Sequence, residues 1–145
     1  HIGSKKELSP ALQAKLQSCI ETLKGNERLI FTLAINYGGR SEIAHAVQEI
    51  VAQGIPADAI TEKTISDHLY TAGIPDPDLV IRTSGELRTS NFLIWQSAYA
   101  EWYFTKTYWP DFNKESLREA ILDYANRSRR FGGRTKKEEE ETYND

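Results

Sequence analysis

Residues 77–86 read PDLVIRTSGE, and this stretch carries the strongest signal for the fold. Asp78–Arg82 has an apolar centre after a proline, which is typical of a strand buried in a parallel sheet. Hydroxylated residues and a glycine follow directly, so the strand should end in a polar loop. In open sheets of parallel strands, ligands bind beyond the carboxyl ends of the strands. The stretch therefore predicts a buried strand and a candidate binding loop.

Helices and strands alternate along the rest of the chain, which favours an α/β fold with a mainly parallel sheet flanked by helices. Polar caps and apolar spacing place the ends of the elements. The predicted elements are a helix that starts at Pro10 after the cap Ser9 and ends at Gly25-Asn26, a buried strand over Leu29–Ile35, a helix with Ile43, Val47, Ile50 and Val51 on its apolar face, a helix capped by Thr61, the strand over Asp78–Arg82, a helix over Ser90–Ala100, a strand over Trp102–Phe104, and a helix from the cap Asn113 to about Arg130.

Length and composition fit one packed domain: 145 residues, 39% of them hydrophobic and 27% charged. We expect residues 1–133 to be part of a single domain and residues 134–145 to be a charged, disordered tail. The net charge of −3 provides no basic field of the kind that attracts a duplex, so nucleic acid is not an expected partner.

Cysteine content and hydropathy indicate a soluble protein of a reducing compartment, which we expect to be the cytoplasm. The one cysteine excludes an intrachain disulfide framework. No apolar run is long enough to span a bilayer. The chain starts with His1 and contains no methionine, so we expect it to be a piece of a longer protein.

Asn36–Arg40, the sequence NYGGR, follows the predicted strand Leu29–Ile35. Adjacent glycines allow a close backbone approach, and the first amides of a helix suit an anion. Two interpretations remain open for this segment. It is either a tight turn from strand to helix with Arg40 in solvent, or part of an anion site.

Arg82 and Arg88 lie on the loop after the second predicted strand, among small hydroxylated residues. Arginine forks match phosphate oxygens, so the loop could hold a diphosphate; the alternative is that both arginines form structural ion pairs. Glu101 is either an ordinary surface residue or a ligand of a largely hydrated Mg²⁺ beside that diphosphate.

Several motifs together resemble the cis-prenyltransferase family, and most of all its bacterial undecaprenyl diphosphate synthases. They cover nearly the whole chain in the family's order. The matching segments are Asn36–Arg40, Pro77–Glu86, Arg88–Leu93, Trp95-Gln96, Tyr99–Glu101, Trp109–Phe112 and Arg129–Gly133. The resemblance implies the C-terminal part of the cis-prenyltransferase fold and a transferase that extends an allylic prenyl diphosphate with isopentenyl diphosphate to a long-chain cis-polyprenyl diphosphate.

The resemblance also implies roles for individual residues. Arg82, Arg88 and Ser90, with Thr89 between them, match the family's binders of the isopentenyl diphosphate group, and Glu101 matches a Mg²⁺ ligand. Arg130 and Gly132 match an element that reaches the diphosphate across a homodimer interface. Release of a long polyprenyl product implies a peripheral contact with the membrane.

Two departures from the family pattern stand out. Leu87 occupies a position where a histidine is frequent, which puts a second metal contact in doubt. The family's Asp-Gly-Asn loop, with its catalytic aspartate, is absent, so we expect no catalytic residue of that kind in this chain and no activity from the chain alone. The alternatives are a non-catalytic diphosphate-binding subunit that needs a partner chain, and an unrelated phosphate-binding domain.

Overall fold

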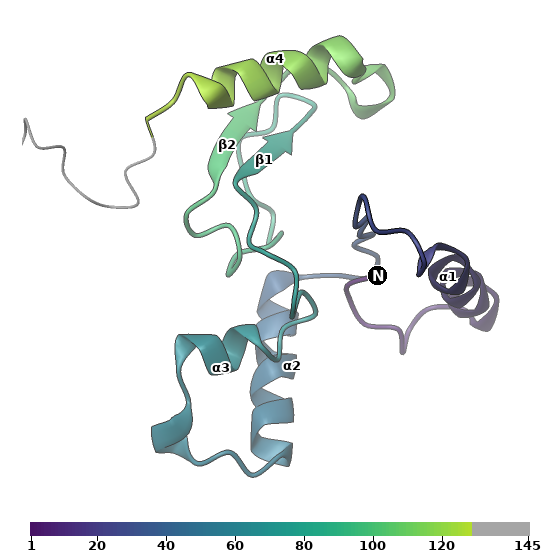
Figure 1. Cartoon of the computed structure of the whole chain (residues 1–145), viewed down its shortest axis with the longest axis vertical. Coiled ribbons are helices and arrows are strands. Elements are labelled where there is room, and N and C mark those ends of the chain that lie inside the picture. The colour runs from purple at the N-terminus through teal and green to yellow at the C-terminus, as the bar shows by residue number, and fades with distance from the viewer. Residues whose placement is uncertain (129–145) are drawn as a thin grey trace, which may run out of the picture. The chain divides into compact units, whose positions relative to one another are not determined.

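The computed structural model describes residues 1–128 (Figure 1). Arg130, Gly132 and the predicted tail lie outside the described residues. No helix within residues 1–128 combines the length and the apolarity needed to cross a membrane. The elements in chain order are α1 (Pro10–Leu23), α2 (Gly39–Ala52), the 3₁₀ helix η1 (Ala57–Ala59), α3 (Glu62–Ser66), β1 (Leu79–Arg82), β2 (Glu101–Phe104), the 3₁₀ helix η2 (Trp109–Asp111) and α4 (Lys114–Ala125).

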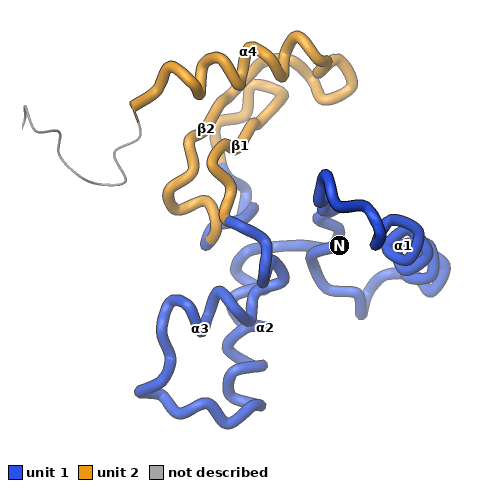
Figure 2. The backbone as a smooth tube through the Cα atoms, viewed as in Figure 1, with its two compact units in different colours: residues 1–75, 89–95 blue, residues 76–88, 96–145 orange. Residues whose placement is uncertain are grey.

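The chain divides into two compact units, coloured separately in Figure 2. Unit 1 consists of residues 1–75 and 89–95 and contains α1, α2 and α3. Unit 2 consists of residues 76–88 and the chain from Gln96 onward, and contains both strands and α4. The connection between β1 and β2 therefore belongs partly to each unit.

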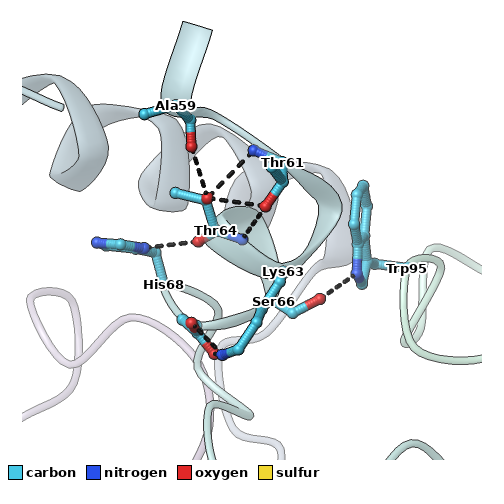
Figure 3. Close-up of polar contacts among 8 residues, drawn as sticks. Ala59, Thr61, Lys63, Thr64, Ser66, His68 and Trp95 are labelled. Carbon is cyan, nitrogen blue, oxygen red and sulfur yellow. Dashed lines mark hydrogen bonds and ion pairs between the residues drawn. The ribbon is translucent and has the colours of Figure 1, made fainter. Parts of the chain in front are cut away.

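The helix starts in unit 1 follow from their capping residues. Ser9 Oγ accepts a hydrogen bond from the Leu12 amide at 3.3 Å, and Pro10 occupies the first turn of α1, where its missing N–H is no loss. Thr61 and Thr64 form a reciprocal capping box at α3, drawn in Figure 3. Both caps predicted from the sequence are confirmed.

The buried side of α2 differs in part from the predicted apolar face. Ala46 and Ile50 are buried, and Leu69 is buried after α3. Val47 and Val51, predicted on the apolar face, are 47% and 69% exposed. The helix instead turns Glu42 inward together with Ala46 and Ile50, because the carboxylate finds hydrogen-bond donors there.

Glu42 is a fully buried carboxylate in the first turn of α2. One of its oxygens accepts the backbone N–H of Tyr70 at 2.9 Å, and the other accepts the hydroxyl of Tyr37. The Tyr70 ring stacks on His45 with ring centroids 5.0 Å apart. Because a buried charge is tolerated only with good partners, this cluster fixes the start of α2 against the residues that follow α3.

The predicted buried strand over Leu29–Ile35 is wrong. Of residues 29–35, only Ala34 forms a bridge, which is parallel to Ile2, and the Ile2 N–H donates to the Leu33 carbonyl at 2.9 Å. Leu29, Ile30 and Phe31 are 70–76% exposed. An apolar run becomes a strand only where neighbouring backbone satisfies its N–H and C=O groups, and the described chain supplies that neighbour at one point only.

The parallel arrangement predicted for the sheet is confirmed in unit 2. Strands β1 and β2 pair in parallel, with Leu79 opposite Glu101 and Arg82 opposite Phe104. Helix α4 packs against β2, and Asn113 Oδ1 caps it by accepting the Ser116 amide at 3.1 Å. The helix ends at Ala125, earlier than the predicted end near Arg130.

The predicted helix over Ser90–Ala100 is also wrong, since this segment consists of turns and bends. Ser90, Asn91 and Leu93 have φ angles of 48°, 65° and 45°. Such left-handed conformations cannot continue a right-handed α-helix. Several apolar side chains of the segment are exposed, Phe92 at 39% and Tyr99 at 68% among them.

The Tyr70 contact predicts a specific loss of stability at alkaline pH. Burial, and to a smaller degree the Glu42 charge, raises the pKa of Tyr70 above 10.0. The folded state then holds the phenol proton more tightly than the unfolded state does. The contribution to stability is fully present below about pH 10 and is lost as the pH rises through the raised pKa.

Tyr70→Phe should therefore flatten the fall of the denaturant midpoint between about pH 9 and pH 11, since phenylalanine has no proton to lose. Equal slopes for wild type and Tyr70→Phe would contradict the expectation.

Candidate functional site

The loop after β1 is fixed to the chain that follows β2. The Ser84 amide donates to the Thr107 carbonyl at 2.9 Å, and the Gly85 amide donates to the Thr105 carbonyl at 2.8 Å. Ser84 and Gly85 have φ angles of 69° and 70°, a conformation in which glycine carries no steric penalty. The loop is thus a defined turn at the carboxyl end of the ladder, where the sequence predicted a binding loop.

The structure brings Arg82, Glu86 and Arg88 together on this loop. The Arg82 guanidinium donates to the backbone carbonyl of Arg88, and the Arg88 guanidinium forms an ion pair with Glu86. The Arg88 and Glu86 side chains are 66% and 43% exposed. The ion-pair alternative is therefore observed for Arg88, but an exposed pair stabilises by only about 0–1 kcal/mol, so a stronger anion can replace Glu86.

Glu101 lies at the other end of the ladder from Arg82, because it is the first residue of β2 and pairs with Leu79. At about 3.3 Å per residue, the two positions are roughly 10 Å apart along the strands. The carboxylate accepts a hydrogen bond from Arg127 Nη1 at 2.9 Å, and both side chains are 30% exposed.

Arg127 ties Glu101 to the end of α4. Its guanidinium also donates to the Trp102 carbonyl at 3.0 Å and forms an ion pair with Asp123. Hydrogen bonding to Glu101 raises the pKa of Arg127 above its ordinary value, so the guanidinium stays charged. Glu101 is therefore not a simple surface residue, and part of its charge is compensated by Arg127.

As a metal ligand, Glu101 fits one mode of Mg²⁺ binding. No group of three or more His, Cys, Asp or Glu side chains that could hold a metal ion occurs within residues 1–128. A dedicated protein cage is therefore not formed by these residues. Mg²⁺ commonly binds through one or two carboxylates, with water and substrate phosphates completing its shell, and the hard carboxylate oxygens of Glu101 suit that mode.

The NYGGR segment is a turn whose helix amides are occupied by the protein itself. The Gly39 amide donates to the Asn91 carbonyl at 2.7 Å, and the Arg40 amide donates to Asn91 Oδ1 at 2.9 Å. The double glycine accommodates this approach: an added Cβ would lie 2.7 Å from Asn91 Nδ2 at Gly38 and 2.6 Å from Ile94 Cγ1 at Gly39. A tight turn with an exposed Arg40 is observed, although residues 29–35 before it form no strand, and these two amides are not available to an anion.

Thr89 and Ser90 belong to unit 1, whereas Arg82, Arg88 and Glu101 belong to unit 2. The Thr89 carbonyl accepts the Phe92 amide at 3.0 Å, and Ser90 has left-handed backbone geometry. Sequence reasoning missed Asn91, which stands next to Ser90. A usable signal was the preference of asparagine for left-handed backbone beside a predicted ligand residue.

Unit 1 also contains an apolar hollow of about 1000 Å³ between α1 and residues 24–33. Leu16, Ile20 and Leu23 line it from the helix, and Ile30 and Phe31 line it from the segment that was predicted to be a strand. The exposed apolar side chains of that segment therefore face a shared concave surface rather than being scattered.

Comparison with known proteins identifies relatives of the whole described chain. The family described as putative undecaprenyl diphosphate synthase matches residues 1–132. An isoprenyl transferase of Listeria monocytogenes serotype 4b is 57% identical over 109 residues, which are 72% of this chain and 43% of the relative. One from Heliobacterium mobile is 50% identical over 136 residues, 91% of this chain and 52% of the relative. The chain spans about half the length of the curated relatives it matches.

A solved structure shares both the fold and substantial sequence identity. Lavandulyl diphosphate synthase from Lavandula x intermedia, in complex with dimethylallyl diphosphate, superposes with a TM-score of 0.86 at 40% identity, over 90% of this chain and 58% of that chain. The family match over residues 1–132 agrees with this likeness in fold and sequence, and together they assign the chain to one protein family. The chain belongs to the undecaprenyl diphosphate synthase family of cis-prenyltransferases.

Proposed function

We propose that this chain is the C-terminal part of an enzyme that extends an allylic prenyl diphosphate with isopentenyl diphosphate, giving a long-chain cis-polyprenyl diphosphate of the kind that serves as a cell-wall lipid carrier precursor. The observation that carries the proposal is the loop with Arg82, Glu86 and Arg88 in a chain that matches the family over residues 1–132. A relative of the same fold was solved with dimethylallyl diphosphate, a compound of the proposed substrate class.

In the proposed reaction, the C–O bond of the allylic diphosphate breaks and diphosphate leaves. The double bond of isopentenyl diphosphate forms the new C–C bond, and a proton is lost to restore a double bond. Arg82 and Arg88, with Thr89 and Ser90, would bind the diphosphate of isopentenyl diphosphate and hold its double bond in place, a proximity effect. The exposed Arg88 guanidinium can exchange its Glu86 partner for a diphosphate.

Mg²⁺ is the proposed cofactor, with Glu101 as one of its ligands. When bound, the ion would supply charge neutralisation for the diphosphate groups. Arg127 Nη1 donates to one carboxylate oxygen of Glu101, and the other oxygen would be the one to contact the ion. The donor chemistry of Glu101 supports this assignment.

The remaining proposals concern assembly and location. We propose a homodimer in which Arg130 and Gly132 reach the diphosphate site of the partner subunit. The exposed aromatic residues Tyr108 and Trp109, 65% and 73% exposed, support a further contact surface in unit 2. The proposed compartment is the cytoplasm, with a peripheral membrane contact during product release.

The isolated 145-residue chain should not catalyse prenyl transfer, because these residues contain no Asp-Gly-Asn segment. Joining or mixing the chain with an N-terminal half that carries this segment should produce Mg²⁺-dependent incorporation of labelled isopentenyl diphosphate into a long polyprenyl product. Incorporation by the chain alone, well above a mock preparation, would show that other residues perform the chemistry. Binding of isopentenyl diphosphate without turnover in the complete protein would favour the non-catalytic subunit.

Arg88→Ala in the complete enzyme should weaken binding of isopentenyl diphosphate far more than binding of the allylic diphosphate. Loss of a charge-assisted hydrogen bond predicts an effect of about 1.5–3 kcal/mol. Arg118→Ala, an exposed arginine of α4, is the matched control and should change neither affinity. Equal losses for both substrates in Arg88→Ala would contradict the assignment.

Glu101→Gln should retain the fold and lower turnover at limiting Mg²⁺, with partial recovery at high Mg²⁺, since the amide keeps the shape of the side chain but not its charge. Asp123→Asn is the matched control, because Asp123 also pairs with Arg127. Steady-state rates across a Mg²⁺ titration compare the two variants. A wild-type titration curve for Glu101→Gln, or the same shift in Asp123→Asn, would refute a metal role for Glu101.

A further inference from the structure

Asn91 connects the segment next to the proposed diphosphate binders with the start of α2. Its backbone carbonyl accepts the Gly39 amide at 2.7 Å, and its Oδ1 accepts the Arg40 amide at 2.9 Å. These amides belong to the first turn of α2, where backbone N–H groups lack partners within the helix. One residue from a distant part of the chain thus caps this helix with two hydrogen bonds.

The backbone around Asn91 would not hold its conformation without such contacts. Ser90 and Asn91 are consecutive left-handed residues, with φ angles of 48° and 65°. Left-handed backbone is costly for residues other than glycine and persists where the surroundings determine it. Two hydrogen bonds tie Asn91 to Gly39 and Arg40, so the backbone of the adjacent Ser90 is constrained at its C-terminal side.

Two further contacts fix the same segment on its other side. The Trp95 indole N–H donates to Ser66 Oγ of α3 at 3.0 Å, as Figure 3 shows. The Phe92 ring meets the Tyr37 ring edge-on, with centroids 5.8 Å apart. Residues 91–95 are therefore anchored to helices α2 and α3 of unit 1. Thr89 and Ser90 directly precede this anchored segment.

We infer that Asn91 is a positioning residue for isopentenyl diphosphate: it holds Ser90 and Thr89 in the geometry that binds the diphosphate group, without touching the substrate itself. This inference rests on the proposed function. Gly38 and Gly39 belong to the same device, since a side chain at either position would displace the contact that Asn91 makes. Gly38 and Gly39 thus help to position Thr89 and Ser90. The Gly39 and Arg40 amides themselves are bonded to Asn91 and do not bind phosphate.

The test compares Asn91→Gly with wild type in the complete enzyme. Glycine permits the left-handed backbone, so this variant removes only the side-chain acceptor. The Arg40 amide should exchange its hydrogen faster, and KM for isopentenyl diphosphate should rise about tenfold, the effect of losing one hydrogen bond of about 1.4 kcal/mol. The kcat value and KM for the allylic diphosphate should stay within about twofold of wild type.

Ser41→Ala is the matched control. Ser41 Oγ donates to the Gly38 carbonyl at 2.8 Å, so its loss perturbs the same turn without touching residues 89–95. It should leave both KM values unchanged. Asn91→Asp retains the oxygen acceptor and should restore slow exchange of the Arg40 amide, which a general loosening of the turn would not do.

Gly39→Ala disturbs the hydrogen bond between the Gly39 amide and the Asn91 carbonyl from the α2 side. It provides a second test if Asn91→Gly unfolds. Its Cβ would lie 3.3 Å from the Asn91 carbonyl and 2.6 Å from Ile94 Cγ1, so KM for isopentenyl diphosphate should rise selectively here too. Unchanged exchange of the Arg40 amide in Asn91→Gly, or equal rises in both KM values, would overturn the inference. A wild-type enzyme without prenyl transfer would overturn the proposed function, while the exchange data would still report on the Asn91 contact.

Discussion

Backbone pairing between β1 and β2 is the constraint on which unit 2 depends. The parallel register places Arg82 at one end of the ladder and Glu101 at the other. Because the strands run in the same direction, the chain leaving β1 and the chain leaving β2 emerge at one edge, where Ser84 and Gly85 hydrogen-bond to Thr107 and Thr105. The loop that carries Arg82, Glu86 and Arg88 is therefore shaped by these hydrogen bonds between the two chain segments and not by helix formation.

Arg88 and Arg127 both pair with carboxylates, but their surroundings differ. Arg127 is enclosed by Glu101, Asp123 and a carbonyl, and its role is to join α4 to β2. Arg88 has one exposed carboxylate partner on a turn. Arg127 has several partners and a side chain that is 30% exposed, whereas Arg88 has a side chain that is 66% exposed, so Arg88 is the cation better suited to exchange its partner.

Local chemistry made several elements predictable. Ser9, Thr61 and Asn113 mark helix starts because their side chains accept backbone N–H groups within the next turn, a purely local event. The strand predicted over Asp78–Arg82 is observed over Leu79–Arg82, and it followed from a short apolar run after a proline. The candidate loop could be located for the same reason, because it begins where that strand ends.

Contacts between distant residues could not be predicted. The apolar run Leu29–Ile35 does not reveal whether a backbone neighbour exists, and the apolar residues of Ser90–Ala100 do not reveal its left-handed residues. Asn91 and Arg40 are 51 positions apart in the sequence, and only the folded chain shows that they meet.

The left-handed pairs at Ser84-Gly85 and Ser90-Asn91 carry a consequence for sequence variation. Valine, isoleucine and threonine are excluded at such positions by their branched Cβ, whereas glycine, asparagine and aspartate are accommodated. Related sequences should therefore carry mostly small or amide side chains at these four positions, even where no ligand touches them. Backbone conformation alone is enough to make a position look selected for function.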